Sequence, residues 1–228
     1  HFSIIMSIVF QNIRCLIDKL FHFSYNTYWV FFMLQKIIGK TKRAIEDFNM
    51  IDEGDKIAVG LSGGKDSITL LYALYYLQKF YRKHFEIMAI TIHPGSETFD
   101  TTELKKICDE LGVEYLVYNS NISQVVFDIR KEENPCSLCA NMRRGMLNSL
   151  AVEHGCNKIA LGHHMDDVME TFLMSVLLNG RIHTFAPVTY LSRSNVKTIR
   201  PMIYVEEKLI RSVAKEKNFP VMNKCCPA

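Results

Sequence analysis

The sequence has no run of about 18 consecutive apolar residues, which is the length that a membrane-spanning helix needs. It has no internal repeat and no low-complexity tract, and its net charge at pH 7 is only +3. A nucleic-acid partner must therefore be inferred from where the positive charges lie rather than from their total. What is present is an ordinary globular composition, 48% apolar and 22% charged in 228 residues, enough for one large domain.

Seven cysteines occur without a recognisable secretory signal, so a disulfide scaffold is not expected. Their number instead predicts a reduced, cytoplasmic compartment in which some of the thiols bind a metal. Cys15, Cys108 and Cys156 are isolated in the sequence, and we interpret them as simple buried thiols.

The first 32 residues differ from the rest. They are rich in Phe, Tyr and Ile, and their apolar stretches are interrupted by Arg14, Asp18 and Lys19. They lack the basic start and the small-residue cleavage site of a signal peptide, and an interfacial helix would need more cations. We expect residues 1–32 to be an extension outside the natural domain, which would begin at Met33 and occupy residues 33–228. A chain beginning at Met33 should then be at least as soluble as the full chain.

From residue 33 onward, short apolar runs alternate with longer amphipathic segments. Strands are expected at 56–61, 85–92, 113–119 and 157–162, and helices at 35–49, 66–82, 103–112, 137–155, 166–180 and 205–218. Strands joined through helices predict right-handed crossovers and a doubly wound, parallel α/β sheet of the Rossmann type in a single domain. Ligands of such sheets bind at the carboxyl ends of the strands, so the segment after the first strand is expected at the active edge.

The segment 59–71, VGLSGGKDSITLL, places glycines, a lysine, an aspartate and serines between that strand and a helix. It is not a Walker A loop, because Gly60 lies only four residues before Gly64 and Asp66 stands where Ser or Thr would hold magnesium. The glycines still let backbone N–H groups approach an anion at a helix N-terminus, and Lys65 adds a positive charge. Asp66 would repel a phosphate unless a cation intervenes, so the loop predicts a phosphate bridged by magnesium. The alternative, a glycine turn capped by serine, would leave the SGGKDS string as coincidence.

The segment 134–145, NPCSLCANMRRG, carries Cys136 and Cys139 in a C-x2-C pair at the start of a helix, followed by two arginines. Thiolates at this spacing hold one metal atom or cluster, although zinc, iron–sulfur and redox-disulfide sites all use such a pair. The remaining candidate ligands are Cys225 and Cys226, in the segment NKCCPA. Three thiolates are too few for a closed zinc site and suit an iron–sulfur cluster with one open position.

The segment 161–171, LGHHMDDVMET, leads from the fourth strand into a helix whose first turn holds Asp166 and Asp167. Acids at this position often serve only as partners of the helix dipole and as caps. The fourth strand is, however, expected beside the first one, which would direct His163 and Asp167 toward the nucleotide. Asp167 would then reach magnesium or orient the attacking group, whereas His164 is predicted to pack or to hydrogen-bond locally.

In order and in spacing, SGGKDS, PCSLCANMRRG and LGHHMDDVMETFLM resemble the tRNA 2-thiocytidine synthetase family, which belongs to the PP-loop (N-type) ATP pyrophosphatases. The resemblance covers residues 33–228, and the family pattern is expected to continue beyond Ala228, so the domain is interpreted as C-terminally truncated. It implies an enzyme that adenylates a cytidine of the tRNA anticodon loop and replaces its 2-oxygen with sulfur, using ATP, Mg²⁺ and a [4Fe–4S] cluster. The implied partners are tRNA and a sulfur donor such as a cysteine desulfurase, with no membrane, and a homodimer is the expected assembly.

The resemblance also assigns roles to individual residues. Catalytic roles are implied for Asp66, Asp167, Arg143, Cys136, Cys139 and Cys226. Nucleotide contacts are implied for Leu61, Ser62, Gly63, Gly64, Lys65, Asp66, Ser67, Ile92, Gly162, His163 and Arg200. Magnesium would be held by Asp66 and Asp167, and the cluster by Cys136, Cys139 and Cys226, with Cys225 as the alternative third ligand.

Positive charge gathers in parts of the chain. Between Thr171 and Met202 there is no acidic residue, but there are four basic ones, namely Arg181, Arg193, Lys197 and Arg200. The first expected helix carries four more, Lys36, Lys40, Lys42 and Arg43. These stretches favour contact with a phosphate backbone at one edge of the molecule. For the first helix, a merely solvated face is an equally good interpretation.

Two alternative functions remain open. One is a different PP-loop tRNA enzyme, which would make lysidine or 2-thiouridine. Lysidine synthetases share SGGKDS but do not need the CSLC cysteines, and the thiouridine branch adds N-terminal zinc-binding cysteine pairs that this sequence lacks. The other is a non-catalytic ATP-binding or metal-binding module, against which the intact Lys65, Asp66, Asp167 and CSLC pair argue.

Overall fold

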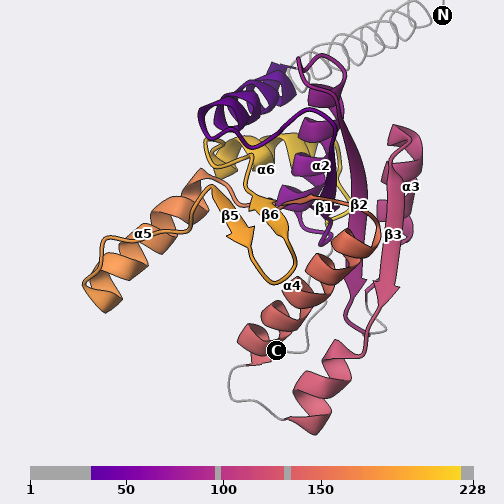
Figure 1. Cartoon of the computed structure of the whole chain (residues 1–228), viewed down its shortest axis with the longest axis vertical. Helices are drawn as coiled ribbons and strands as arrows, with labels where there is room; N and C mark the ends of the chain where they lie inside the picture. The colour runs from indigo at the N-terminus through magenta and orange to yellow at the C-terminus, as the bar shows by residue number, and fades with distance from the viewer. Residues whose placement is uncertain (1–31, 96–98, 131–134, 222–228) are drawn as a thin grey trace, which may run out of the picture.

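The computed structural model describes residues 32–95, 99–130 and 135–221. Its centre is one six-stranded sheet with the strand order β3-β2-β1-β4-β6-β5 (Figure 1). The strands are β1 (Asp55–Gly60), β2 (Phe85–His93), β3 (Glu114–Asn119), β4 (Lys158–Ala160), β5 (Val188–Leu191) and β6 (Val196–Ile199). Neighbouring strands run parallel except β5 and β6, which form an antiparallel hairpin at one side of the sheet.

Helices cover both faces of the sheet (Figure 1). The first described helix covers residues 32–47. The others are α2 (Lys65–Gln78), α3 (Thr102–Leu111), the short π-helix η1 (Gln124–Ile129), α4 (Pro135–Glu153), α5 (Met165–Asn179) and α6 (Glu207–Glu216). The first helix, α2, α3 and α6 share one core cluster, while α4 and η1 pack against the other face. None of the described helices combines the length and the apolar content that crossing a bilayer demands.

The central strand β1 shows why this layering forms. Ile57, Ala58 and Val59 are all fully buried, as a strand with helices on both faces requires. Because successive side chains point to opposite faces, Ile57 and Val59 enter one core cluster and Ala58 enters the other. A continuous apolar run therefore fixes β1 in the middle of the sheet.

The position of β1 also fixes where a ligand can bind. The chain continues from β1 to β2 on one side, and later adds β4 on the other side, with Val59 paired to Ala160. The loops that follow β1 and β4 therefore leave the same edge side by side, at the point where the strand order reverses. In doubly wound sheets this crevice is the usual ligand site.

The predicted α/β class and the adjacency of the first and fourth strands are confirmed. The prediction that α2 continues to residue 82 was wrong, because the chain turns after Gln78 and buries Tyr81 edge-on against Phe85, with ring centroids 6.1 Å apart. The four predicted strands do pair in parallel, but the β5–β6 hairpin, whose strands pair antiparallel, was not predicted. Both strands of the β5–β6 hairpin have four residues, too few for a periodic pattern, and η1 was not predicted either.

Candidate active site

The loop between β1 and α2 is held in shape by its two serines. The backbone N–H of Ser62 donates to the hydroxyl of Ser67 over 3.1 Å, and the two hydroxyl oxygens lie 3.2 Å apart. The Ser67 hydroxyl donates in turn to the carbonyl oxygen of Gly64 over 2.9 Å. Gly63 adopts a φ of 80°, which strains any residue with a side chain. Because the N-cap of α2 is Gly64, no side chain caps the helix, and an anion can bind its first-turn amides.

Gly162, two residues after β4, lets the neighbouring strand approach this loop closely. A Cβ atom built on Gly162 would lie 3.0 Å from the carbonyl carbon of Asp66 and 3.1 Å from both the Asp66 oxygen and the Ser67 nitrogen. These are backbone atoms, which cannot move aside as the end of a flexible side chain can. A glycine at this position is therefore a steric requirement of the contact between the two loops.

Lys65 lies at the start of α2 between two carboxylates. Its Nζ is 3.1 Å from Asp66 Oδ2 and 3.0 Å from Oε1 of Glu207, at the start of α6. Burial disfavours the charge of Lys65, but the hydrogen bonds to Glu207 and Asp66 outweigh it and raise the pKa of Lys65. The hydrogen bond from Lys65, followed by that from Arg211, lowers the pKa of Glu207. Lys65 is therefore a firmly charged cation beside the glycine loop.

Asp66 has a carboxylate oxygen that finds no hydrogen-bond donor among the described residues. Its Oδ1 is buried and unpartnered, whereas Oδ2 contacts Lys65. Nε2 of His164 lies 3.7 Å from Oδ1, which is too far for a hydrogen bond. Buried polar atoms are rarely left in this state. A hard cation such as Mg²⁺ would supply the missing partner, so this residue fits the predicted metal.

The start of α5 is organised by hydrogen bonds of its own. His164 is buried and forms a capping box with Asp167, whose carboxylate accepts the His164 N–H over 2.8 Å. Asp166 accepts the backbone N–H of Glu207 over 2.7 Å and so caps α6. The predicted local hydrogen bonding of His164 is confirmed, and both acids do act as caps. The Asp167 side chain remains 34% exposed, and its contact with magnesium stays a prediction.

Arg200 and His163 converge on the ring of Phe185. The guanidinium carbon of Arg200 lies 5.1 Å from the ring centroid, and the His163 ring lies 5.0 Å from it. Arg200 Nη1 donates to the carbonyl oxygen of Ala186 over 2.7 Å. Nε of Arg200 and Nδ1 of His163 are nevertheless buried without partners in the described part of the chain.

The electrostatics of this pair favour an anion. Burial, followed by the charge of Arg200, lowers the pKa of His163, so its ring is neutral at pH 7. Burial, followed by the charge of Arg144, lowers the pKa of Arg200. Two arginines therefore repel each other across a site in which the Nε–H of Arg200 has no acceptor among the described residues. A bound phosphate would relieve this repulsion and accept that hydrogen bond.

A cavity of about 210 Å³ lies between this edge of the sheet and α4. It is lined by Gly60, Leu61, Ser62, Ile90, Ile92, Phe99, Ala140, Arg143, Arg144, Leu147 and Leu161. The structure thus brings together the predicted Leu61, Ser62, Ile92 and Arg143. An apolar cavity with a few polar groups at its rim suits a nucleotide base.

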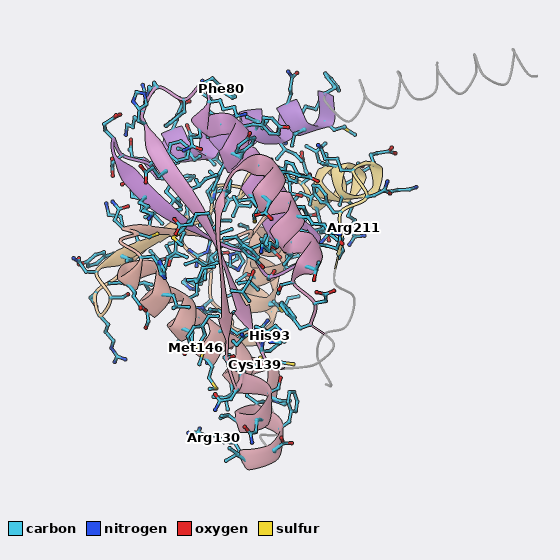
Figure 2. The ribbon with its side chains drawn as sticks, turned by 90° about the vertical axis from the view of Figure 1, so that its right-hand side faces the viewer. Phe80, His93, Arg130, Cys139, Met146 and Arg211 are labelled. Atoms are coloured by element: carbon cyan, nitrogen blue, oxygen red, sulfur yellow. The ribbon has the colours of Figure 1, made fainter. Side chains whose placement is uncertain are left out.

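Cys136 and Cys139 lie in the first turns of α4. Both are free thiols, Cys139 buried and Cys136 exposed. Their spacing of three residues places them on one side of the helix, and Ala140, next to Cys139, lines the cavity. Figure 2 shows Cys139 at the end of the molecule where β2 stops at His93.

The third predicted thiolate, Cys226, and its alternative Cys225 lie outside the described residues. Among the residues that are described, no three His, Cys, Asp or Glu side chains gather to hold a metal ion. Each predicted metal would therefore need further ligands, such as ATP oxygens, water or Cys226. The predicted buried thiols Cys108 and Cys156 are confirmed. Burial raises the pKa of Cys108 to about 12 and also raises that of Cys156, so neither is a ready ligand.

A family model described as a PP-loop domain matches residues 33–223. A tRNA-cytidine(32) 2-sulfurtransferase of Geobacter metallireducens is 40% identical over 194 residues, which are 85% of this chain and 76% of that protein. The protein of the same name from Dichelobacter nodosus is 42% identical over 191 residues, 83% of this chain and 70% of its own length. The chain belongs to the tRNA-cytidine(32) 2-sulfurtransferase family of PP-loop proteins.

Solved structures agree with this family. The U34-tRNA thiolase NcsA of Methanococcus maripaludis, solved with its [4Fe–4S] cluster, superposes with a TM-score of 0.67 at 27% identity. The match covers 85% of this chain and 67% of that one. A phosphoadenylyl-sulfate reductase of Candida auris, at 11% identity and a TM-score of 0.51, shares the fold alone. The resemblance seen in the sequence motifs is thereby confirmed at the level of the family.

Two residues of this site were missed by the sequence analysis. Glu207 contacts Lys65 although 142 positions separate them in the chain (207 − 65). Phe185 contacts the guanidinium group of Arg200 and the ring of His163, but a single aromatic residue in a connecting segment gives no pattern to detect. The acid-rich start of α6 was visible in the sequence as VEE, and only the fold places it beside the loop.

Proposed function

We propose that this chain is an ATP-dependent tRNA sulfurtransferase that converts cytidine 32 of the anticodon loop to 2-thiocytidine. One observation carries the proposal: the glycine loop and the cysteine-bearing helix form opposite walls of the same cavity. Leu61 and Ser62 line one wall, and Ala140, next to Cys139, lines the other. An activating nucleotide and a thiolate site would therefore meet at one point. The names of the relatives support tRNA as the substrate.

ATP would bind with its base in the cavity and its pyrophosphate on the loop. The first-turn amides of α2 and the Lys65 ammonium would hold the departing phosphates. Asp66 Oδ1, which lacks a partner among the described residues, would hold Mg²⁺ against those phosphates, with Asp167 as a second carboxylate. The fixed loop shape means that these groups need little rearrangement to do so.

The unpartnered nitrogens of Arg200 and His163 would face the α-phosphate. In the proposed reaction the 2-oxygen of cytidine attacks the α-phosphorus, and pyrophosphate leaves with the bond electrons. A sulfur nucleophile at the oxidation level of sulfide then attacks C2, and AMP leaves with the former 2-oxygen. Arg200 would stabilise the negative charge on the phosphorus, and the neutral His163 would contribute a hydrogen bond without adding charge. Arg143 would contact the nucleotide or the target base.

Cys136 and Cys139, with Cys226, would hold a [4Fe–4S] cluster. The soft thiolate pair at the start of α4 fits this group. When bound by three thiolates, a cluster supplies one iron without a protein ligand, at which sulfur can be held. The chain itself places Cys139 next in sequence to Ala140, which lines the cavity.

The tRNA would contact the basic stretch between residues 171 and 202, which lacks acidic residues. A separate sulfur donor, such as a cysteine desulfurase, would supply sulfur. Because its substrate is tRNA, we place the chain in the cytoplasm.

The nucleoside product tests the proposal directly. A strain lacking the gene should lose 2-thiocytidine from its tRNA, and a plasmid copy should restore it, as measured by mass spectrometry of nucleoside digests. Loss of 2-thiouridine or lysidine instead would overturn the choice of base and favour one of the alternative PP-loop enzymes.

The colour of the protein tests the thiolates. Protein prepared without air should be brown, and alanine at Cys136, Cys139 or Cys226 should each bleach it. Alanine at the buried Cys108 or Cys156 should not, which controls for general damage. If Cys225→Ala bleaches the sample and Cys226→Ala does not, the third ligand is Cys225. Colourless anaerobic protein with stoichiometric zinc would contradict the cluster.

A further inference from the structure

Helix α6 packs beside α2 (Figure 1), and its first residue, Glu207, contacts the starts of two other helices. Oε1 of Glu207 lies 3.0 Å from Nζ of Lys65, at the start of α2. The backbone N–H of Glu207 donates to Asp166, at the start of α5, over 2.7 Å. The other carboxylate oxygen, Oε2, lies 2.7 Å from Nη2 of Arg211, one turn further along α6. The carboxylate of Glu207 is therefore fixed between two cations, one of which belongs to the glycine loop.

Lys65 needs such a partner, because its own helix does not fix the direction of its side chain. Lysine has a flexible four-carbon stem, and neighbouring residues of a helix, such as Lys65 and Asp66, do not face each other. The ion pair with Asp66, at 3.1 Å, therefore constrains the ammonium group from one side only. Glu207 belongs to a different helix and supplies a second fixed point. No other described carboxylate lies within ion-pair distance of Lys65.

The preceding residue, Glu206, is an acid with a different partner. Its Oε1 lies 2.7 Å from Nζ of Lys40, on the first described helix. Both acids lie at a helix start, where the helix dipole favours negative charge. The dipole alone would therefore account for an acid at either position. It does not account for the pairing of Glu207 with a lysine of the glycine loop.

We propose that Glu207 is a positioning residue, which holds the ammonium group of Lys65 beside the glycine loop at the place where the departing pyrophosphate would bind. This inference rests on the proposed function, since it takes the loop to be the phosphate site. Lys65 would touch the phosphate oxygens, and Glu207 would act only through Lys65. The position of this cation matters, because a displacement of about 1 Å can remove much of the effect of a group that stabilises a transition state.

Glu207→Gln separates the effect of position from that of charge. It removes a negative charge from the neighbourhood of the anion, so charge alone would make inorganic pyrophosphate bind more tightly. The positioning role predicts the opposite, because Lys65 loses its second fixed point. We expect the affinity of the full chain for inorganic pyrophosphate, measured by isothermal titration calorimetry, to fall by about fivefold. The rate of tRNA-dependent pyrophosphate release from ATP should fall by about tenfold.

A double-variant cycle shows whether Glu207 acts through Lys65. Lys65→Met keeps most of the apolar stem and removes the ammonium group. In that background, Glu207→Gln should cause no further loss of pyrophosphate affinity, because no cation is left to position. An acid that only stabilised the start of α6 would cause the same loss in both backgrounds. Circular dichroism checks that all the variants are folded.

Glu206→Gln is the matched control, because it removes the neighbouring acid and breaks an ion pair that does not involve Lys65. It should not weaken the binding of pyrophosphate. Unchanged or tighter binding by Glu207→Gln, an equal loss in both backgrounds, or an equal loss in Glu206→Gln would each overturn the positioning role and leave the proposed function standing. Wild-type protein that releases no pyrophosphate from ATP in the presence of tRNA would overturn both.

Discussion

At the start of β4, the edge of the sheet where the parallel strands begin, Lys158 is only 2% exposed and has a carboxylate on either side. Its Nζ lies 2.5 Å from Asp55 Oδ2 and 2.8 Å from Asp52 Oδ2. The other oxygen of Asp55 accepts a hydrogen bond from the Asn157 amide over 2.7 Å. At this edge the buried charges are paired and the polar atoms are satisfied.

The carboxyl edge of the same sheet is arranged differently. Among the described residues, four buried side-chain atoms lack a hydrogen-bond partner, and three of them gather here: Asp66 Oδ1, His163 Nδ1 and Arg200 Nε. An unsatisfied buried polar atom costs about 1–3 kcal/mol of folding free energy. Three such atoms at one edge of the sheet therefore indicate a function, which is to bind a ligand. Satisfied charges therefore mark the part of this fold that stabilises it, and unsatisfied polar atoms mark the part that binds a ligand.

The strongest effect should come from removing the Asp66 carboxylate at the carboxyl edge. Asp66→Ala should lower tRNA-dependent release of pyrophosphate from ATP by at least about a thousandfold, roughly 4 kcal/mol, because the cation proposed beside the phosphates would lose its carboxylate ligand. The melting temperature should hardly change, since one oxygen of Asp66 had no partner.

The matched control is Asp109→Ala, an exposed carboxylate on α3. It should leave both pyrophosphate release and melting temperature as they are. Unaltered pyrophosphate release from the Asp66 variant would remove the interpretation of the loop as an ATP pyrophosphatase site.

The next largest effect is expected at the opposite edge of the sheet, where Lys158 pairs with Asp55. Lys158→Met keeps the apolar stem but leaves Asp55 buried without its cation, which should cost about 3 kcal/mol of unfolding free energy in a urea titration. The kcat of the protein that remains folded should be unchanged. A drop in kcat with full stability would mean that the two edges are not divided as described.

A smaller effect concerns pH. The lowered pKa of His163 means that the unfolded chain binds a proton more readily than the folded one. The contribution of His163 to stability is then fully present above the ordinary histidine pKa of about 6.5 and is lost as the pH falls through the lower, folded value. We expect the unfolding free energy to decrease on acidification below about pH 6.5.

The decrease should be smaller in His163→Gln, as measured by urea titrations at several pH values. His183→Gln, at an exposed position, serves as the control and should retain the full decrease. A pH profile identical in wild type and the His163 variant would contradict the assigned burial of a neutral ring.

The smallest effect is expected at Thr41, outside both edges of the sheet. The fourth unpartnered atom is Oγ1 of Thr41, on the first described helix. If a single neutral hydroxyl is a packing feature and not a ligand site, Thr41→Val should leave pyrophosphate release intact. Its unfolding free energy should change by less than about 1 kcal/mol. Lost activity with normal stability would show that unpartnered atoms outside the carboxyl edge also serve the ligand.

The sequence alone was sufficient for the parts of the site that are local in the chain. The SGGKDS loop, the CSLC pair and the capping of α5 each lie within a few residues, and hydrophobic periodicity placed them on the right elements. Leu61 and Ile92, for which the family resemblance implied nucleotide contacts, both line the cavity.

What could not be predicted depends on distant pairs. The ion pair of Lys65 with Glu207 and the stacking of Arg200 on Phe185 form only when the fold is complete. The β5–β6 hairpin escaped detection for a related reason, because four-residue strands derive their stability from pairing with β4 rather than from a pattern of their own. The exposure of the apolar side chains of α5, such as Leu177 at 78%, was not predicted either.

The steric contact at Gly162 has a consequence for how binding energy is used. Since the backbones of the two loops are already in contact and the serines already close the phosphate loop, the nucleotide does not have to order this segment when it arrives. The conformational entropy that a flexible loop would lose on binding the nucleotide is here already lost when the chain folds. The binding energy of ATP is therefore available to stabilise the transition state and is not used to assemble the site. Gly162→Ala would remove this advantage by pushing the two backbone segments apart, although its methyl group contacts no reacting atom.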